Sequence, residues 1–174
     1  MLALSLVAAL ASPAGACDST RARWPNAPGD PLRAWIQPAD GSGPGVMTDY
    51  DAVRRAFLSW NAVFLPVRFA FTADSAIADV RVRWIARFDR PMSGNTECVL
   101  TDDNWILRAD VVLAIARFDG RRLDTHEMHG LALHEIGHAI GLVHQPKGVM
   151  AATTRVRELT AADRTAARRL YGLP

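Results

Sequence analysis

The residues with the clearest chemistry lie in one short string near the C-terminal end of the chain. His134 and His138 are four residues apart, so on a helix their imidazoles share one face. Two imidazoles placed in this way can bind a single zinc ion at about 2.0–2.1 Å. Glu135 follows the first histidine directly and would lie beside that ion, where a general base is needed. The spacing therefore predicts a helix that carries two metal ligands and a proton acceptor.

A third histidine completes the predicted ligand set. Gly137 keeps the helix narrow near the metal, and Gly141 allows a sharp turn that brings His144 to the same ion. Three neutral imidazoles leave the fourth zinc position open to water, which distinguishes a catalytic site from a closed structural one. Zinc in such a site lowers the pKa of its water to about 7. We therefore predict amide hydrolysis, with Glu135 as the general base.

The order H-E-x-x-H-x-x-G-x-x-H in residues 134–144 resembles the zinc signature of the metzincins. Metzincins also have a methionine turn beneath the zinc, and Gly148-Val149-Met150 is similar to it, with Met150 as the expected methionine. The order of segments is most similar to the matrixin branch and covers nearly all of the chain after its leader. The resemblance implies an endopeptidase with one catalytic zinc that cleaves proteins or peptides. It also implies that the strand near 96–101 is the edge that pairs with an extended substrate.

Two departures from the matrixin pattern concern metals. Matrixins carry a second, structural zinc and calcium ions in the loop before the edge strand. No histidine precedes His126, so we expect this second zinc to be absent. His126 and His129 are most simply bystanders on the helix, and a second metal site is the alternative. Four aspartates could bind calcium, although a solvated loop is the simpler interpretation: Asp89, Asp102, Asp103 and Asp110.

A third departure concerns substrate specificity. The stretch 150–159 is short, and in matrixins it walls the pocket for the residue that follows the cleaved bond. Arg155 and Arg157 lie in this stretch. They either bias the pocket toward acidic or polar groups or contribute to surface solubility, and the second interpretation is the simpler one.

Alternation and helical periodicity predict the elements that must position these residues. Strands are predicted at 32–37, 67–71, 78–84, 96–101 and 110–116. Helices are predicted after an N-cap at Thr48, from Asp124 or Thr125 to Ile140, and from Thr160 to Tyr171. Because the helices are segregated around one sheet, the predicted class is α+β. With the resemblance, the expectation is a metzincin-like catalytic domain: a mixed, mostly parallel twisted sheet with two long helices and a C-terminal helix.

The composition is that of one ordinary globular domain. The chain has 174 residues, of which 49% are hydrophobic and 22% are charged. A chain of this length can bury a core without needing disulfides. The net charge of +2 is too small to indicate a nucleic-acid partner. No internal repeat or linker divides the chain, and we expect a monomer.

The first sixteen residues are typical of a signal peptide. Residues 2–11 form an apolar run too short to cross a bilayer, although no Lys or Arg precedes it. Ala14-Gly15-Ala16 then has the small-x-small form of a cleavage site. A buried N-terminal helix is the alternative. We therefore predict a leader at 1–16, a catalytic domain at 17–174 without a transmembrane helix, and a secreted or periplasmic location.

The sequence contains two cysteines, Cys17 and Cys98. In an oxidising compartment an even count favours a disulfide between them. Lipidation of Cys17 as the first mature residue is a second interpretation, weakened because Ala14 stands where leucine is usual. A thiolate that caps the zinc is the third, and nothing around Cys17 resembles the matrixin latency motif.

Three functions have to be compared. An active secreted endopeptidase uses every residue of the histidine string. A zinc-stabilised binding module would use the histidines but has no use for Glu135, which argues against it. A narrow enzyme that cuts one small peptide or a cell-wall cross-bridge shares the chemistry and differs only in its pocket.

Overall fold

The structure is a computed structural model that describes residues 15–17, 22–25, 30–39, 44–153 and 155–174. Its strands are β1 (Gly15–Ala16), β2 (Leu32–Ile36), β3 (Phe69–Phe71), β4 (Val80–Ile85), β5 (Gly94–Leu100) and β6 (Ile106–Ala114). Its helices are α1 (Met47–Asn61), α2 (Thr125–Ala139) and α3 (Ala161–Leu170). Of the predicted leader, residues 1–14 lie outside the described part of the chain.

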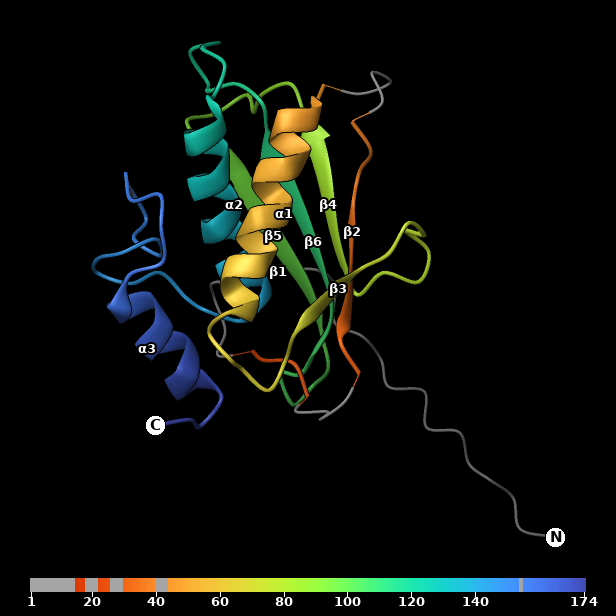
Figure 1. Cartoon of the computed structure of the whole chain (residues 1–174), viewed down its shortest axis with the longest axis vertical. Helices are drawn as coiled ribbons and strands as arrows, with labels where there is room; N and C mark the ends of the chain where they lie inside the picture. The colour runs from red at the N-terminus through yellow and green to blue at the C-terminus, as the bar shows by residue number, and fades with distance from the viewer. Residues whose placement is uncertain (1–14, 18–21, 26–29, 40–43, 154) are drawn as a thin grey trace, which may run out of the picture.

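The strands form one mixed sheet in the order β1-β5-β6-β4-β2-β3. β3, β2, β4 and β6 run parallel to one another, whereas β5 is antiparallel to β6. α1 and α2 lie side by side over one face of the sheet, and α3 lies near the C-terminal end of α2 (Figure 1). Parallel neighbours need crossover connections, and α1 supplies the one between β2 and β3. The predicted α+β class with a mostly parallel sheet is confirmed.

The core lies between the sheet and the two long helices. Alternate residues of β4 are buried, as period two requires: Val80, Val82 and Trp84. On α1, Phe57 and Trp60 are buried at helical spacing in the same core, where Phe57 packs edge-on against Phe69 of β3. The indole N–H of Trp60 also donates a hydrogen bond of 3.0 Å to the carbonyl oxygen of Leu133. The aromatic stripe of α1 is therefore core packing that fixes α1 against α2.

The start of α1 differs from the sequence prediction. The helix begins at Met47 with Val46 as its N-cap, not after an N-cap at Thr48. The reason is Asp49, whose carboxylate accepts hydrogen bonds from the backbone N–H of Val46 (3.2 Å) and from Arg122 (2.6 Å). The second of these bonds comes from a residue 73 positions away, so local sequence does not reveal it.

All five predicted strands have somewhat different bounds in the structure, and the differences at β3 and β6 can be explained. β3 keeps only the last three residues of the predicted strand 67–71, because the Asn61 side chain bonds the backbone N–H and carbonyl of Phe69 at 2.8 and 3.0 Å. β6 begins at Ile106, four residues before the prediction, and ends two residues before it. Its first residues pair with β5 from Ile106 onward, and β4 joins on the other side from Ala109, so the sheet holds this part as a strand.

The starts of α2 and α3 agree with the predicted caps. Asp124 accepts a hydrogen bond of 2.8 Å from the backbone N–H of Glu127, whose own carboxylate accepts one of 3.1 Å from the N–H of Asp124. Thr160 and Asp163 form the same capping box at α3. These reciprocal bonds satisfy the free N–H groups of the first helical turn, so both helices begin where their local sequence predicts.

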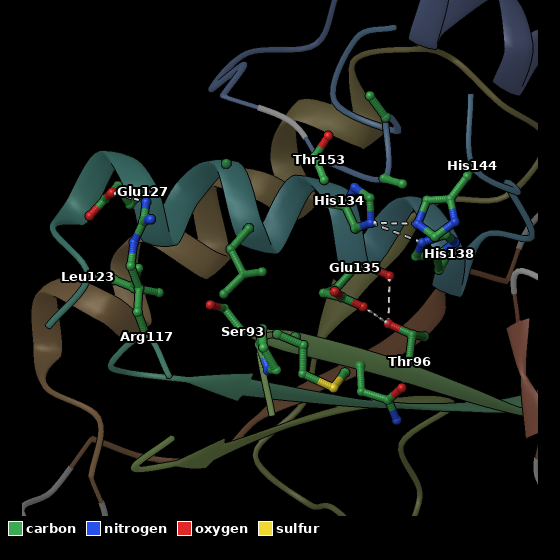
Figure 2. A pocket seen from close by; sticks show the side chains of 18 of the residues that line it. Ser93, Thr96, Arg117, Leu123, Glu127, His134, Glu135, His138, His144 and Thr153 are labelled. Carbon is green, nitrogen blue, oxygen red and sulfur yellow. Dashed lines mark hydrogen bonds and ion pairs between the residues drawn. The ribbon is translucent and has the colours of Figure 1, made fainter. Parts of the chain in front are cut away.

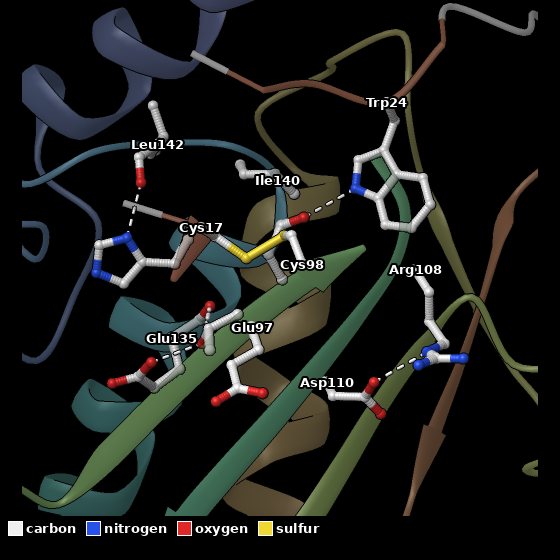
Figure 3. The surroundings of a disulfide bond; sticks show 12 residues. Cys17, Trp24, Glu97, Cys98, Arg108, Asp110, Glu135, Ile140 and Leu142 are labelled. Carbon is white, nitrogen blue, oxygen red and sulfur yellow. Dashed lines mark hydrogen bonds and ion pairs between the residues drawn. A yellow bond between two sulfur atoms is a disulfide. The ribbon is translucent and has the colours of Figure 1, made fainter. Parts of the chain in front are cut away.

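The N-terminal segment is attached to the edge of the sheet. Gly15 and Ala16 pair antiparallel with Cys98 and Glu97 of β5, forming β1. Cys17 forms a disulfide with Cys98, with their Cα atoms 5.2 Å apart, and both cysteines are buried (Figure 3). In this structure Cys17 has no thiolate to offer a metal ion.

Candidate metal centre

Three histidines from α2 and the turn after it converge on one point. The Nε2 atom of His134 lies 3.1 Å from Nε2 of His138 and 3.3 Å from Nε2 of His144 (Figure 2). Nitrogen ligands bound to a tetrahedral zinc at about 2.0–2.1 Å lie about 3.3 Å from each other. Within the described ranges, these three side chains are the one group of His, Cys, Asp or Glu placed to hold a metal ion. The structure thus brings the three predicted ligands together at the separation that zinc requires.

Backbone carbonyls fix the protons of two of these rings. Nδ1 of His134 lies 2.7 Å from the carbonyl oxygen of Val149, and Nδ1 of His138 lies 2.7 Å from that of Leu142. Because a carbonyl oxygen only accepts, each Nδ1 carries the proton and donates it. When both rings are neutral, their Nε2 lone pairs then point toward each other. Such lone pairs repel unless a cation lies between them, so the donor set fits a zinc ion.

The turn after α2 depends on Gly141. Its φ is +97°, in the left-handed region that side chains disfavour, and a Cβ there would collide with the carbonyl oxygen of Ala22. The backbone N–H of Gly141 donates to His138 (2.8 Å) and that of Leu142 to Gly137 (3.0 Å), which closes the helix end. A glycine is therefore required where the chain leaves α2 toward His144.

Two aromatic side chains complete the C-terminal end of α2. The indole N–H of Trp24 donates to the carbonyl oxygen of Ala139 at 2.8 Å, and the hydroxyl of Tyr171 donates to that of Ile140 at 3.0 Å. Carbonyls in the last turn of a helix have no partner within the helix, so these bonds satisfy them. Burial raises the pKa of Tyr171, which keeps its hydroxyl protonated as a donor.

Met150 packs against α2 at Gly137, between two of the histidines in sequence. It is fully buried, and a Cβ on Gly137 would collide with its sulfur atom. Asp163 of α3 accepts hydrogen bonds from the backbone N–H groups of Val149 (3.1 Å) and Met150 (3.2 Å). Burial alone would raise the pKa of Asp163, but these bonds and those from Thr160 outweigh it and lower the pKa. An ionised carboxylate therefore holds the predicted methionine turn in place.

Glu135 points toward the sheet edge and is only 5% exposed. The hydroxyl of Thr96 in β5 donates a short hydrogen bond of 2.6 Å to its Oε2 (Figure 2). A Cβ on Gly94, two residues earlier in the strand, would collide with Oε1, so β5 runs directly against the carboxylate. Sequence reasoning found Glu135 but neither Gly94 nor Thr96. No local signal points to them, because their role depends on which strand faces α2.

The histidines and Glu135 line a cavity of about 520 Å³ between α2 and β5. At its far end, Arg117 binds the carboxylate of Glu127 at 2.7 Å (Figure 2). Arg121, outside the cavity lining, binds the same carboxylate at 2.6 Å. The hydrogen bond from Arg121 is the main cause that lowers the pKa of Glu127, to about 2. Arg157 also lines the cavity, whereas Arg155 does not.

The remaining metal candidates lie apart from this cluster. His126 is exposed on α2, and Nδ1 of His129 bonds the carbonyl oxygen of Ala52 at 3.0 Å. Asp110 is ion-paired with Arg108 at 2.9 Å. Asp89, Asp102 and Asp103 join no metal-binding group in the described part of the chain.

A model of one protein family, the matrixins, matches residues 45–172, which include all three helices and the three clustered histidines. The chain belongs to the matrixin family. Matrixins are zinc metallopeptidases with a catalytic zinc, and the histidine cluster of this matrixin is compatible with that ion. No curated protein matches the chain.

Proposed function

We propose that this matrixin is a secreted zinc endopeptidase in which His134, His138 and His144 hold the zinc and Glu135 is the general base. The observation that carries the proposal is the convergence of three Nε2 atoms beside a buried carboxylate, at one end of a cavity bounded by a sheet edge. A structural zinc site has no use for such a carboxylate. The intact Glu135 therefore favours an enzyme over a zinc-stabilised binding module.

Different residues of the chain have different roles in the proposed peptide hydrolysis. Zinc, when bound, would activate a water molecule and polarise the substrate carbonyl. Glu135 accepts the proton of the attacking water and then gives it to the leaving amine. The hydroxyl of Thr96 donates a hydrogen bond of 2.6 Å to Oε2 of Glu135, which fixes the direction of the carboxylate. Thr96 thus orients the base without touching the substrate.

The outer edge of β5 supplies main-chain hydrogen bonds for an extended peptide. β1 supports this role, because it pairs antiparallel with the same edge at Glu97 and Cys98. A substrate that continues this pairing past Thr96 to Gly94 runs antiparallel to β5. Its backbone then passes beside Glu135, with the C-terminal part of the peptide nearer the cavity.

Export is supported by the leader pattern and by the disulfide, because disulfides persist in oxidising compartments. None of the helices in the described ranges has the length and hydropathy needed to span a bilayer. Cleavage after Ala16 would remove β1 and expose the β5 edge at Glu97, while Cys17 would stay bonded to Cys98. We propose residues 17–174 as the mature, monomeric catalytic domain, bridged through Cys17 in preference to lipid-anchored.

The test compares the chain that begins at Cys17 with its Glu135→Ala variant, by zinc analysis and digestion of a broad peptide library. We expect one zinc per chain in both proteins and cleavage by the wild type alone. General-base catalysis contributes roughly 100- to 10,000-fold, so kcat/KM should fall by about that factor. Glu158→Ala is the matched control, because Glu158 is an exposed carboxylate outside the cavity.

The other outcomes separate the alternatives. Zinc in both proteins with no cleavage by either would favour the binding module. Cleavage confined to one small peptide or cross-bridge would favour the narrow enzyme. Absence of zinc from both would refute the proposed metal centre.

A further inference from the structure

One charged group in the cavity takes no part in the proposed chemistry. Arg157 is half-buried and lines the cavity, whereas Arg155 is exposed and lies outside it. The Arg157 guanidinium donates a hydrogen bond of 3.3 Å to the carbonyl oxygen of its neighbour Val156. Over the described ranges it forms no ion pair with a carboxylate. A half-buried guanidinium in this state can bind an anionic ligand group in fork geometry.

α2 leaves room for this side chain at Gly130. A Cβ on Gly130 would lie 2.5 Å from Cδ of Arg157 and 3.3 Å from its Nη1. Gly130 precedes His134 by four residues, so the two share one face of α2 and lie about 6 Å apart along the axis. The Arg157 side chain therefore lies against the cavity wall, about one helical turn from the metal centre.

The other charged side chains of the cavity already have ionic or hydrogen-bond partners. Arg117 and Arg121 share the carboxylate of Glu127. The carboxylate of Glu135 belongs to the catalytic centre and is bonded to Thr96. Among the described residues that line the cavity, Arg157 thus carries the positive charge that no carboxylate balances.

The direction of the bound peptide decides which substrate residue reaches this charge. β5 runs from Gly94 to Leu100, so an antiparallel peptide runs from the Leu100 end toward Gly94. Met92 and Gly94 line the cavity together with Arg157. The part of the peptide that follows the cleaved bond therefore lies in the cavity. Within that part, the side chain of the residue directly after the cleaved bond lies nearest the histidines.

We propose that Arg157 makes this enzyme selective for a carboxylate side chain, Asp or Glu, on the residue directly after the cleaved bond. The inference rests on the proposed endopeptidase function and names its substrate class. Leu123 and Leu131 also line the cavity and offer apolar surface to the methylene groups of such a side chain.

The test uses two peptides that differ only in Glu or Gln after the cleaved bond, and compares their kcat/KM with the zinc-loaded full-length chain. We expect the Glu peptide to be preferred about tenfold, the value of one good hydrogen bond between charged groups. Arg157→Gln should remove this preference and leave the Gln peptide within about twofold. Arg155→Gln, two residues away and exposed, should retain the full preference. Equal rates for both peptides in the wild type, or a preference that survives Arg157→Gln, would overturn the inference.

Binding gives a second measurement that does not depend on turnover. Fluorescence anisotropy of the two labelled peptides on Glu135→Ala should give a Kd about tenfold lower for Glu, and the added Arg157→Gln change should equalise the two values. Arg157-dependent binding without cleavage by the wild type would overturn the endopeptidase proposal and support the selectivity. Cleavage of both peptides with equal Kd values would overturn only the selectivity.

Discussion

Two of the proposed zinc ligands and the proposed base are each oriented by a hydrogen-bond partner outside α2. The Nδ1 protons of His134 and His138 go to the carbonyls of Val149 and Leu142, and Glu135 receives the hydroxyl proton of Thr96. Partners of this kind fix ring orientation and proton position, and losing one typically costs 10- to 100-fold in affinity or activity, as an order of magnitude. Of the three partners, only Thr96 acts through a side chain that can be replaced.

Thr96→Val should lower kcat/KM about tenfold while zinc content and melting temperature stay close to those of the wild type. Valine matches the shape of the buried threonine but removes the hydroxyl that orients Oε2 of Glu135. Steady-state kinetics on one fluorogenic peptide, with zinc analysis of each protein, measures the effect.

Thr96→Ser is the matched control, since it keeps the hydroxyl and loses only a methyl group. It should retain most of the activity. If serine impairs the enzyme as much as valine does, packing of the methyl group is what matters, and the positioning role is wrong.

At the scale of elements, α3 supports the metal centre without contributing a residue to the cavity. Asp163 in its first turn is completely buried and accepts hydrogen bonds from the backbone N–H groups of Val149, Met150 and Thr160. One carboxylate therefore caps α3 and holds the methionine turn. The same turn places the Val149 carbonyl that orients His134.

Asp163→Asn should destabilise the metal-free protein by about 2 kcal/mol at pH 7, because its amide cannot accept all these bonds and the site stays buried. The pKa of Asp163 is lowered in the folded state, so its contribution is complete above the ordinary value of 3.8 and is lost as the pH falls below it. Urea unfolding at pH 7 and at pH 3 should therefore show a smaller difference between variant and wild type at the lower pH.

Asp51→Asn, on an exposed position of α1, is the control and should change the free energy of unfolding by less than about 0.5 kcal/mol. An Asp163→Asn difference that is equal at both pH values would contradict the role assigned to the ionised carboxylate.

At the scale of the whole molecule, Trp24 and Tyr171, 147 positions apart in the sequence, both bind the C-terminal end of α2. Trp24 bonds the carbonyl of Ala139 from the N-terminal side, and Tyr171 bonds that of Ile140 from the C-terminal side. The disulfide lies nearby and joins residues 81 positions apart (Figure 3). The end of the zinc helix is therefore held by contacts that form only when the whole domain has folded.

Replacing both Cys17 and Cys98 by Ala should reduce the free energy of unfolding by between about 4 and 5 kcal/mol, the chain-entropy value for a closed loop of this length. Chemical denaturation of the double variant, of the oxidised wild type and of the reduced wild type measures it. The reduced wild type should behave as the double variant does. A loss below about 1 kcal/mol would show that β1 and the Trp24 contacts hold the segment without the cross-link.

The sequence by itself determined the parts of this protein that depend on neighbours in the chain. The three proposed zinc ligands and the proposed base lie within residues 134–144, where helical spacing and one left-handed glycine suffice to bring them together. The starts of α2 and α3 follow from capping boxes that are equally local. The start of α1 was misplaced because its Asp49 is held by the distant Arg122.

Only the tertiary structure decided which distant residues meet at the site. Nothing in the sequence distinguishes Arg155 from Arg157. In the fold, Arg155 is exposed to solvent, whereas Arg157 lies against Gly130 in the cavity. It likewise brings Thr96 to Glu135 across 39 residues. Local patterns fix backbone angles and the faces of helices and strands. Strand order and register instead follow from burying one shared core, so contacts between elements exist only in the folded domain.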